Sequence, residues 1–176
     1  TGHADIAAGK KMAADSIFRI ASMTKPITAT AVMMLQDAGK LDVNDPVSKY
    51  LPEFKNIKIK GGGTAQLRIH DLMTHTAGIG RAKGRDVSLA EQAKQIAAQP
   101  IGWKPGAKWK YSHGLTVCGR IIEVVSGQPY DVYLQKNIFD PLGMGDTSFF
   151  PTPAQAPRVV VTYMPSKDRK GIVPSD

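Results

Sequence analysis

RIASMTKPITATAVMMLQDAG, at residues 19–39, is the stretch that decides the fold. Proline is tolerated in a helix only near its start, where backbone N–H groups lack partners, so Pro26 places the start of a helix close to Ser22. Gly39 supplies the left-handed residue that commonly follows a helix end, and the stretch therefore predicts a helix over residues 22–38. Because residues 27–35 are almost all small or apolar, we expect burial on more than one side.

Ser22 and Lys25 are the first candidates for chemistry. A residue three positions further along a helix returns to the same face, one turn on. A serine hydroxyl is a weak nucleophile until a neighbouring group takes its proton, and a lysine amine can hold or steer that proton. These residues alone also fit a plain helix cap followed by a solvated cation, although a cation is unfavourable near the positive end of the helix dipole.

The bulk properties narrow the class of protein. The 176 residues are enough for a domain with its own core, and no apolar run is long enough to predict a transmembrane span. The formal charge is +8, but the basic residues are scattered, which argues against nucleic-acid binding. The single cysteine, Cys118, rules out an internal disulfide and gives no compartment, and the first residues lack a signal-peptide pattern, so the localisation is left open.

Periodicity and punctuation residues predict the remaining elements. The apolar stripe that includes Cys118 makes this residue a core filler rather than a nucleophile. His70 and His75 are five positions apart without a third ligand nearby, which favours structural roles over a metal site, and no cofactor is predicted. The predicted helices are 45–51, 68–75, 88–99, 115–126 and 129–139. The predicted strands are 5–9, 16–20, 57–60 and 158–164.

Several segments, in this order, resemble the serine β-lactamase-like family, which includes class C β-lactamases, D-alanyl-D-alanine carboxypeptidases and family VIII carboxylesterases. They are FRIASMTKP (18–26), DPVSKYLP (45–52), DLMTHTAG (71–78), PG (105–106), YSH (111–113), EVVSG (123–127) and PLGM (141–144). The resemblance implies an α/β plus all-α architecture of the β-lactamase-like (penicillin-binding transpeptidase-like) fold. Residues 1–38 would form strands and the nucleophile helix of the α/β region, 39–148 a mainly helical region, and 149–176 the return to the α/β region.

The resemblance also implies roles for individual residues. Ser22 would be the acyl-accepting nucleophile, Lys25 its proton partner and Tyr111 the general base, while the backbone N–H of Ser22 would supply half of an oxyanion hole. His113 stands where lactamases and carboxypeptidases of this family usually have asparagine, and we expect it either to contact substrate or to line the pocket wall. This departure favours a carboxylesterase of short acyl esters over a β-lactamase or D-alanyl-D-alanine carboxypeptidase. A non-catalytic binding relative is the alternative of another class.

The third box of the family, a Lys-Thr-Gly or His-x-Gly strand, has no match after Gly145. We therefore expect the sheet strands that carry this box, and the second oxyanion donor, to come from a C-terminal remainder of the same protein. Its partners would then be that remainder and a small ester or lactam substrate.

Overall fold

Two compact units make up the protein in the computed structural model, which describes residues 2–84 and 86–175. The larger unit spans residues 23–142, and the smaller unit combines residues 1–22 with 143–176. Within the described residues, no helix is both long enough and apolar enough to cross a bilayer.

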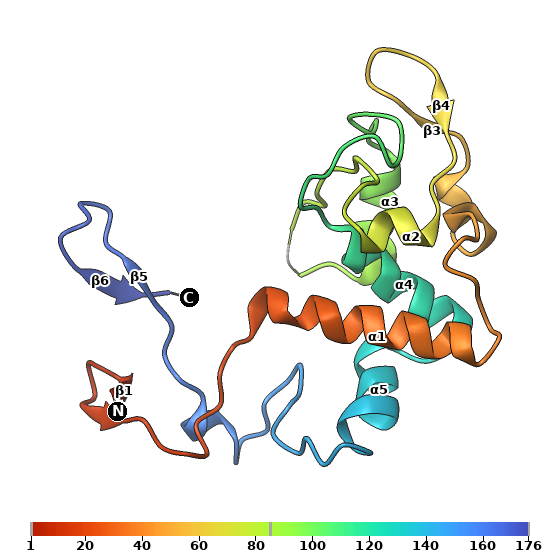
Figure 1. The fold of residues 1–176 in the computed structure, drawn as a ribbon. Helices are drawn as coiled ribbons and strands as arrows, with labels where there is room; N and C mark the ends of the chain where they lie inside the picture. The colour runs from red at the N-terminus through yellow and green to blue at the C-terminus, as the bar shows by residue number, and fades with distance from the viewer. Residues whose placement is uncertain (1, 85, 176) are drawn as a thin grey trace. The chain divides into compact units, whose positions relative to one another are not determined.

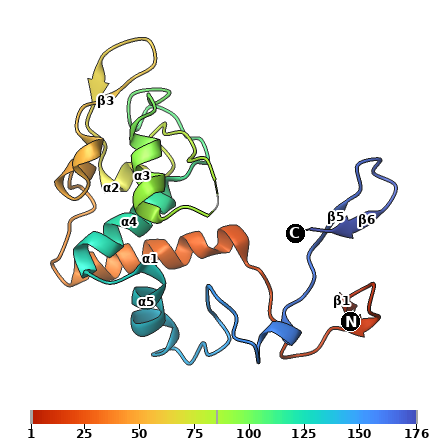
Figure 2. The same cartoon turned by 180° about the vertical axis from the view of Figure 1, so that it is seen from behind.

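Helix α4 (Gly114–Ser126) is the centre of the larger unit. It packs against α1 (Thr24–Asp37), α2 (Ile69–Met73), α3 (Leu89–Ala97) and α5 (Tyr130–Leu134), as Figure 1 and the reverse view in Figure 2 show. Seven of its residues are buried, in keeping with the stripe seen in the sequence. Gly127, at a φ of 69°, ends the helix in the left-handed conformation. The predicted helix over 115–126 is therefore confirmed.

Helix α1 is entered through a 3-10 turn, η1 (Ala21–Met23), and begins at Thr24. The helix predicted over 22–38 is thus confirmed to within two residues. Its burial differs from the expectation, because only one stripe is buried, whereas Met33 is 38% exposed. α4 is its main packing partner in this unit, and α5 also reaches the stripe, because the hydroxyls of Thr28 and Tyr130 are hydrogen-bonded at 2.6 Å. The buried stripe consists of Thr28, Ala31, Val32 and Leu35.

In α2 and α3, single residues set where the helix begins or ends. Helix α3 starts where predicted, because the Ser88 hydroxyl accepts a hydrogen bond from the backbone N–H of Glu91 at 3.2 Å. Helix α2 is shorter than the predicted 68–75. It stops at Met73 because His75 adopts a left-handed backbone, with a φ of 61°.

The segments predicted as helices at 45–51 and 129–139 are less regular than expected. The first gives the 3-10 turn η2 (Val47–Lys49), and a further 3-10 turn, η3 (Pro52–Phe54), follows the predicted segment. The backbone N–H of Val47 donates to the backbone oxygen of Leu67 at 2.8 Å, so a neighbouring segment holds this one in addition to its own turn bonds. The second gives α5 and then a π-helical stretch, η4 (Gln135–Phe139). The predicted strand 57–60 is reduced to β3 (Ile57–Lys58), which pairs antiparallel with β4 (Thr64–Ala65).

The smaller unit corrects the strand predictions. β1 (His3–Asp5) pairs antiparallel with β2 (Lys10–Lys11), so the predicted strand 5–9 is mostly the turn between them. Ile17 makes a single parallel bridge to Val159, and no strand forms over 16–20. The predicted strand 158–164 begins with the last residue of the turn η5 (Ala156–Arg158) and reaches regular pairing only at its end, where β5 (Tyr163–Pro165) meets β6 (Ile172–Pro174). β-propensity indicates where a strand can form, whereas the available partner decides where it does.

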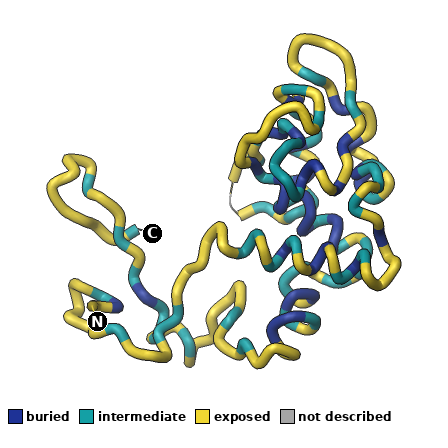
Figure 3. Tube along the Cα trace, in the orientation of Figure 1, coloured by how far each residue is buried: buried dark blue, intermediate teal, exposed yellow. Residues whose placement is uncertain are grey.

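Burial is concentrated in the larger unit, with α4 among its most buried elements (Figure 3). Cys118 lies on α4 and is fully buried, and burial raises the pKa of its thiol to about 12. The prediction that this residue is a core filler is confirmed.

The first residue of α4, Gly114, lies against α2 so closely that a side chain cannot fit. A Cβ atom there would be 2.1 Å from the backbone oxygen of Leu72. We predict that Gly114→Ala lowers the free energy of unfolding by about 1–3 kcal/mol, because the helices must move apart. Urea unfolding would measure this. Gly145→Ala is the matched control, since an added Cβ there meets nothing within 4 Å, and equal stability of the two variants would contradict the prediction.

Candidate active site

Ser22 lies in the η1 turn, two residues before α1 begins. The residue before it, Ala21, has a φ of 44°, a backbone conformation that residues other than glycine rarely adopt. Such strain costs on the order of 1–3 kcal/mol and is found preferentially at functional sites. The chain therefore enters the predicted nucleophile through a strained turn.

Lys25 and Tyr111 come together in the larger unit, although they are 86 positions apart in the sequence. Lys25 is the second residue of α1, and its Nζ atom lies 4.8 Å from the centroid of the Tyr111 ring. An ammonium group at this distance from an aromatic ring is attracted to the ring electrons. Tyr111 is 46% exposed, so its side chain is accessible from solvent. The pair places the lysine amine over the face of the tyrosine ring.

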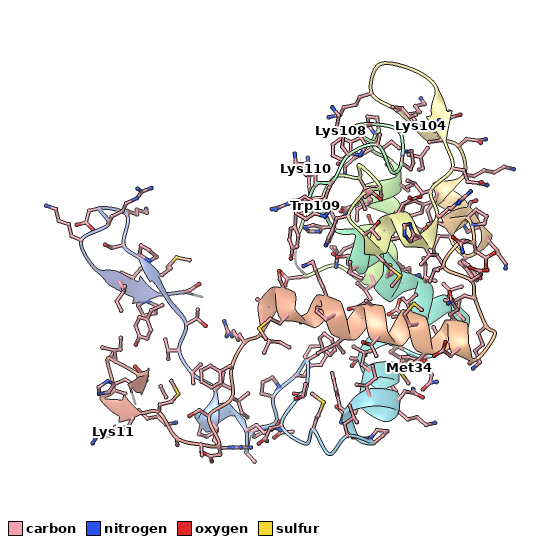
Figure 4. All side chains as sticks on the ribbon, in the orientation of Figure 1. Lys11, Met34, Lys104, Lys108, Trp109 and Lys110 are labelled. Carbon is pink, nitrogen blue, oxygen red and sulfur yellow. The ribbon has the colours of Figure 1, made fainter. Side chains whose placement is uncertain are left out.

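The backbone around Tyr111 is fixed by His75. The N–H of Lys110 donates to the backbone oxygen of His75 at 3.0 Å, and the N–H of Ser112 donates to its Nδ1 atom at 3.3 Å. Figure 4 labels Lys108, Trp109 and Lys110, which lead into Tyr111. Sequence reasoning assigned His75 only a structural role and missed its contact with Tyr111. The sequence signal that could have indicated this contact is the position of His75 within the family segment DLMTHTAG.

His113 is the residue before α4, and its Nδ1 atom is buried without a hydrogen-bond partner among the described residues. Burial lowers the pKa of His113, and the positive charges of Arg81 and Lys25 lower it further. The imidazole is therefore held in its neutral form near the ammonium of Lys25. Its contact with substrate stays a prediction.

The β-lactamase family model matches residues 1–175. The chain belongs to the beta-lactamase family. Its architecture agrees, because the hydrolase EstCE1, described as having promiscuous acyltransferase activity, superimposes with a TM-score of 0.89. That match covers 99% of this chain and 49% of EstCE1 at 24% identity, and it therefore concerns the fold alone. The predicted β-lactamase-like, penicillin-binding-protein-like fold is confirmed.

Curated relatives of this beta-lactamase family chain carry names from two branches. Esterase EstB of Burkholderia gladioli is 36% identical over 92% of this chain, and a putative D-alanyl-D-alanine carboxypeptidase of Salmonella agona is 35% identical over 90%. The matched regions are 45% and 40% of these two relatives, so the chain spans about half the length of the curated relatives it matches. The family is one of serine hydrolases that includes esterases and carboxypeptidases.

The lowered pKa of His113 makes stability depend on pH. Because the unfolded chain keeps an ordinary histidine pKa near 6.5, it binds more protons than the folded chain below that value. We predict that the free energy of unfolding falls as the pH drops from about 7.5 to about 5.5, and that His113→Asn reduces this fall. Urea unfolding at several pH values would measure it, with exposed His3→Asn as control. An unchanged pH dependence in His113→Asn would contradict the assignment.

Proposed function

We propose that this protein is a serine hydrolase that forms an acyl-enzyme on Ser22, and that it acts as a carboxylesterase on short acyl esters. The observation that carries the proposal is the position of the Lys25 amine 4.8 Å from the Tyr111 ring, at the start of the helix that Ser22 precedes. Membership of a serine hydrolase family supports it.

Each residue has a distinct role in the proposed reaction. The Ser22 oxygen attacks the ester carbonyl carbon, and the Ser22 proton passes to the phenolate oxygen of Tyr111, with Lys25 as the proton partner of both. The carbonyl oxygen carries the negative charge of the tetrahedral intermediate and is stabilised by the backbone N–H of Ser22. The proton then goes to the departing alkoxide, which leaves as the alcohol. Water repeats the sequence on the acyl-enzyme, releasing the acid and restoring Ser22.

His113 and the relative EstB favour an ester as the substrate. An asparagine amide at position 113 could both donate to and accept from a substrate amide, whereas a neutral imidazole offers one donor and one acceptor on a rigid ring. The Nδ1 atom of His113 is buried, which leaves only Nε2 for a substrate. This supports a substrate whose recognition needs fewer hydrogen bonds than a peptide or lactam, in agreement with the printed name of EstB.

Cleavage of lactams or D-alanyl peptides is the second candidate, supported by the Salmonella relative. Mass spectrometry after incubation with a fluorophosphonate or with penicillin would separate the candidates, using the protein at its full natural length. Labelling of Ser22 by the phosphonate alone supports the esterase, and labelling by both reagents supports the second candidate. Labelling by neither would overturn the hydrolase proposal in favour of a binding module.

Loss of the phenol should slow the chemistry without unfolding the protein. We predict that Tyr111→Phe lowers kcat on a p-nitrophenyl ester by roughly 10²- to 10⁴-fold, because a positioned acid–base group contributes that much. Tyr133→Phe is the matched control, since Tyr133 is a buried tyrosine on α5 that has no role in the proposed reaction. Full activity in Tyr111→Phe would remove the phenol from the mechanism.

Ser22→Ala tests the nucleophile itself. Alanine fits the same turn, so we predict that turnover and phosphonate labelling are lost while the melting temperature stays close to that of the unsubstituted protein. Steady-state rates, intact mass and thermal unfolding measure the three quantities. Residual labelling at another serine would contradict the assignment of Ser22.

A further inference from the structure

His75 occupies a special position at the end of α2. Its φ of 61° turns the chain out of the helix, and glycine or asparagine would be more usual in this conformation. Backbone hydrogen bonds stabilise this turn: the N–H groups of Thr76 and Ala77 donate to the backbone oxygen of Asp71 at 3.0 and 3.1 Å. The histidine therefore sits on a fixed backbone with a fixed direction for its ring.

This ring and its own carbonyl hold both neighbours of Tyr111. The backbone oxygen of His75 accepts from Lys110 at 3.0 Å, and Nδ1 accepts from the N–H of Ser112 at 3.3 Å. Because one residue binds the positions immediately before and after Tyr111, the backbone of Tyr111 has little freedom to rotate. The Ser112 hydroxyl, 3.5 Å from the same Nδ1 atom, lies on a residue that is itself buried.

The Tyr111 ring is also held by its surroundings. Its centroid lies 4.7 Å from that of the His75 ring at an interplanar angle of 38°, while the Lys25 amine lies 4.8 Å away. Trp109 in turn meets His75 edge-on, with centroids 6.1 Å apart and planes at 84°. Ring separations in this range are favourable for aromatic pairs. The phenol is thereby confined next to the amine with which it would exchange a proton.

The hydrogen bond from Ser112 sets the protonation state that this arrangement needs. A ring nitrogen that accepts an N–H bond carries no proton, so the neutral His75 bears its proton on Nε2. Burial lowers the pKa of His75, and the Lys25 charge lowers it further. The titratable groups that face His75 are Lys25 from α1 and Tyr111 from the 109–112 segment. A proton on Nδ1 would oppose the Ser112 N–H and add a second cation beside Lys25.

We propose that His75 is the positioning residue for Tyr111, holding the phenol against Lys25 through its Nδ1 bond to Ser112, its carbonyl bond to Lys110 and its ring contact. The inference rests on the proposed role of Tyr111 in proton transfer. His75 touches no reacting atom in this scheme, so its effect is on the orientation of the phenol and not on the identity of the base.

Two substitutions that tolerate the left-handed backbone separate the parts of this role. His75→Gly removes the ring and the Nδ1 acceptor, whereas His75→Asn replaces Nδ1 with an amide oxygen that can accept from Ser112. We expect kcat to fall by roughly 10²-fold in the glycine variant with little change in KM, because a misplaced catalytic group costs about that much. The asparagine variant should recover most of the loss. His70→Asn, on the exposed side of α2, is the control.

The pH profile provides a readout that a purely structural role would not move. In the unsubstituted protein kcat should decline on the acid side as His75 takes up a proton below its ordinary value near 6.5. That decline should be weaker or shifted in His75→Asn, because an amide does not titrate and only the contribution of His75 is removed. An identical acid decline in both proteins would overturn the proposal.

Amide hydrogen exchange at Lys110 and Ser112 tests the positioning without reference to activity. Exchange should accelerate at Ser112 in His75→Gly and stay slow in His75→Asn, and unchanged exchange in the glycine variant would overturn the proposal. Failure of Ser22 to react with the phosphonate would instead overturn the proposed function, while the exchange measurement would still decide how Tyr111 is held. A glycine variant with full kcat and slow exchange would exclude a role for His75.

Discussion

The closeness of α4 to α2 is the constraint on which the larger unit depends. The two helices approach until the backbone of Gly114 lies where a single added carbon would overlap the carbonyl of Leu72. α4 also packs against α1, α3 and α5, so a shift of its first residue would change its packing against all three helices. The same close approach sets the distance between the YSH and DLMTHTAG segments, since Gly114 follows His113 and Leu72 precedes His75 by three residues.

The positive charge of Lys25 affects several side chains of the larger unit. Its charge contributes to the lowered pKa of both His75 and His113, and its amine lies over the Tyr111 ring. Two imidazoles that stay neutral can lie near an ammonium without repulsion, and their burial enforces that state. The charge of Lys25 thus acts on both histidines, and at His113 the charge of Arg81 acts in the same direction.

Helices whose ends are set by nearby capping residues were predictable from the sequence, whereas strands, which need a partner distant in the sequence, were not. Ser88 caps the start of α3 and Gly127 the end of α4, and each acts within one turn of its helix. The strand prediction failed at residues 16–20 because the pairing there is limited to one isolated bridge, between Ile17 and Val159. Ser22 and Lys25 were proposed from their spacing and, with Tyr111, from the family resemblance, and their roles stay predictions. The bonds of His75 to residues 110 and 112 join segments that no local pattern connects.

The buried thiol of Cys118 has a practical consequence for probing motion in this chain. Thiolates, not thiols, react with maleimides and iodoacetamides, and a thiol with a pKa near 12 that is closed off from solvent supplies almost none. The only native cysteine among the 176 residues is therefore chemically silent in the folded protein. A cysteine introduced on the exposed surface could carry a fluorophore or spin label at a single defined site, without first replacing a core residue.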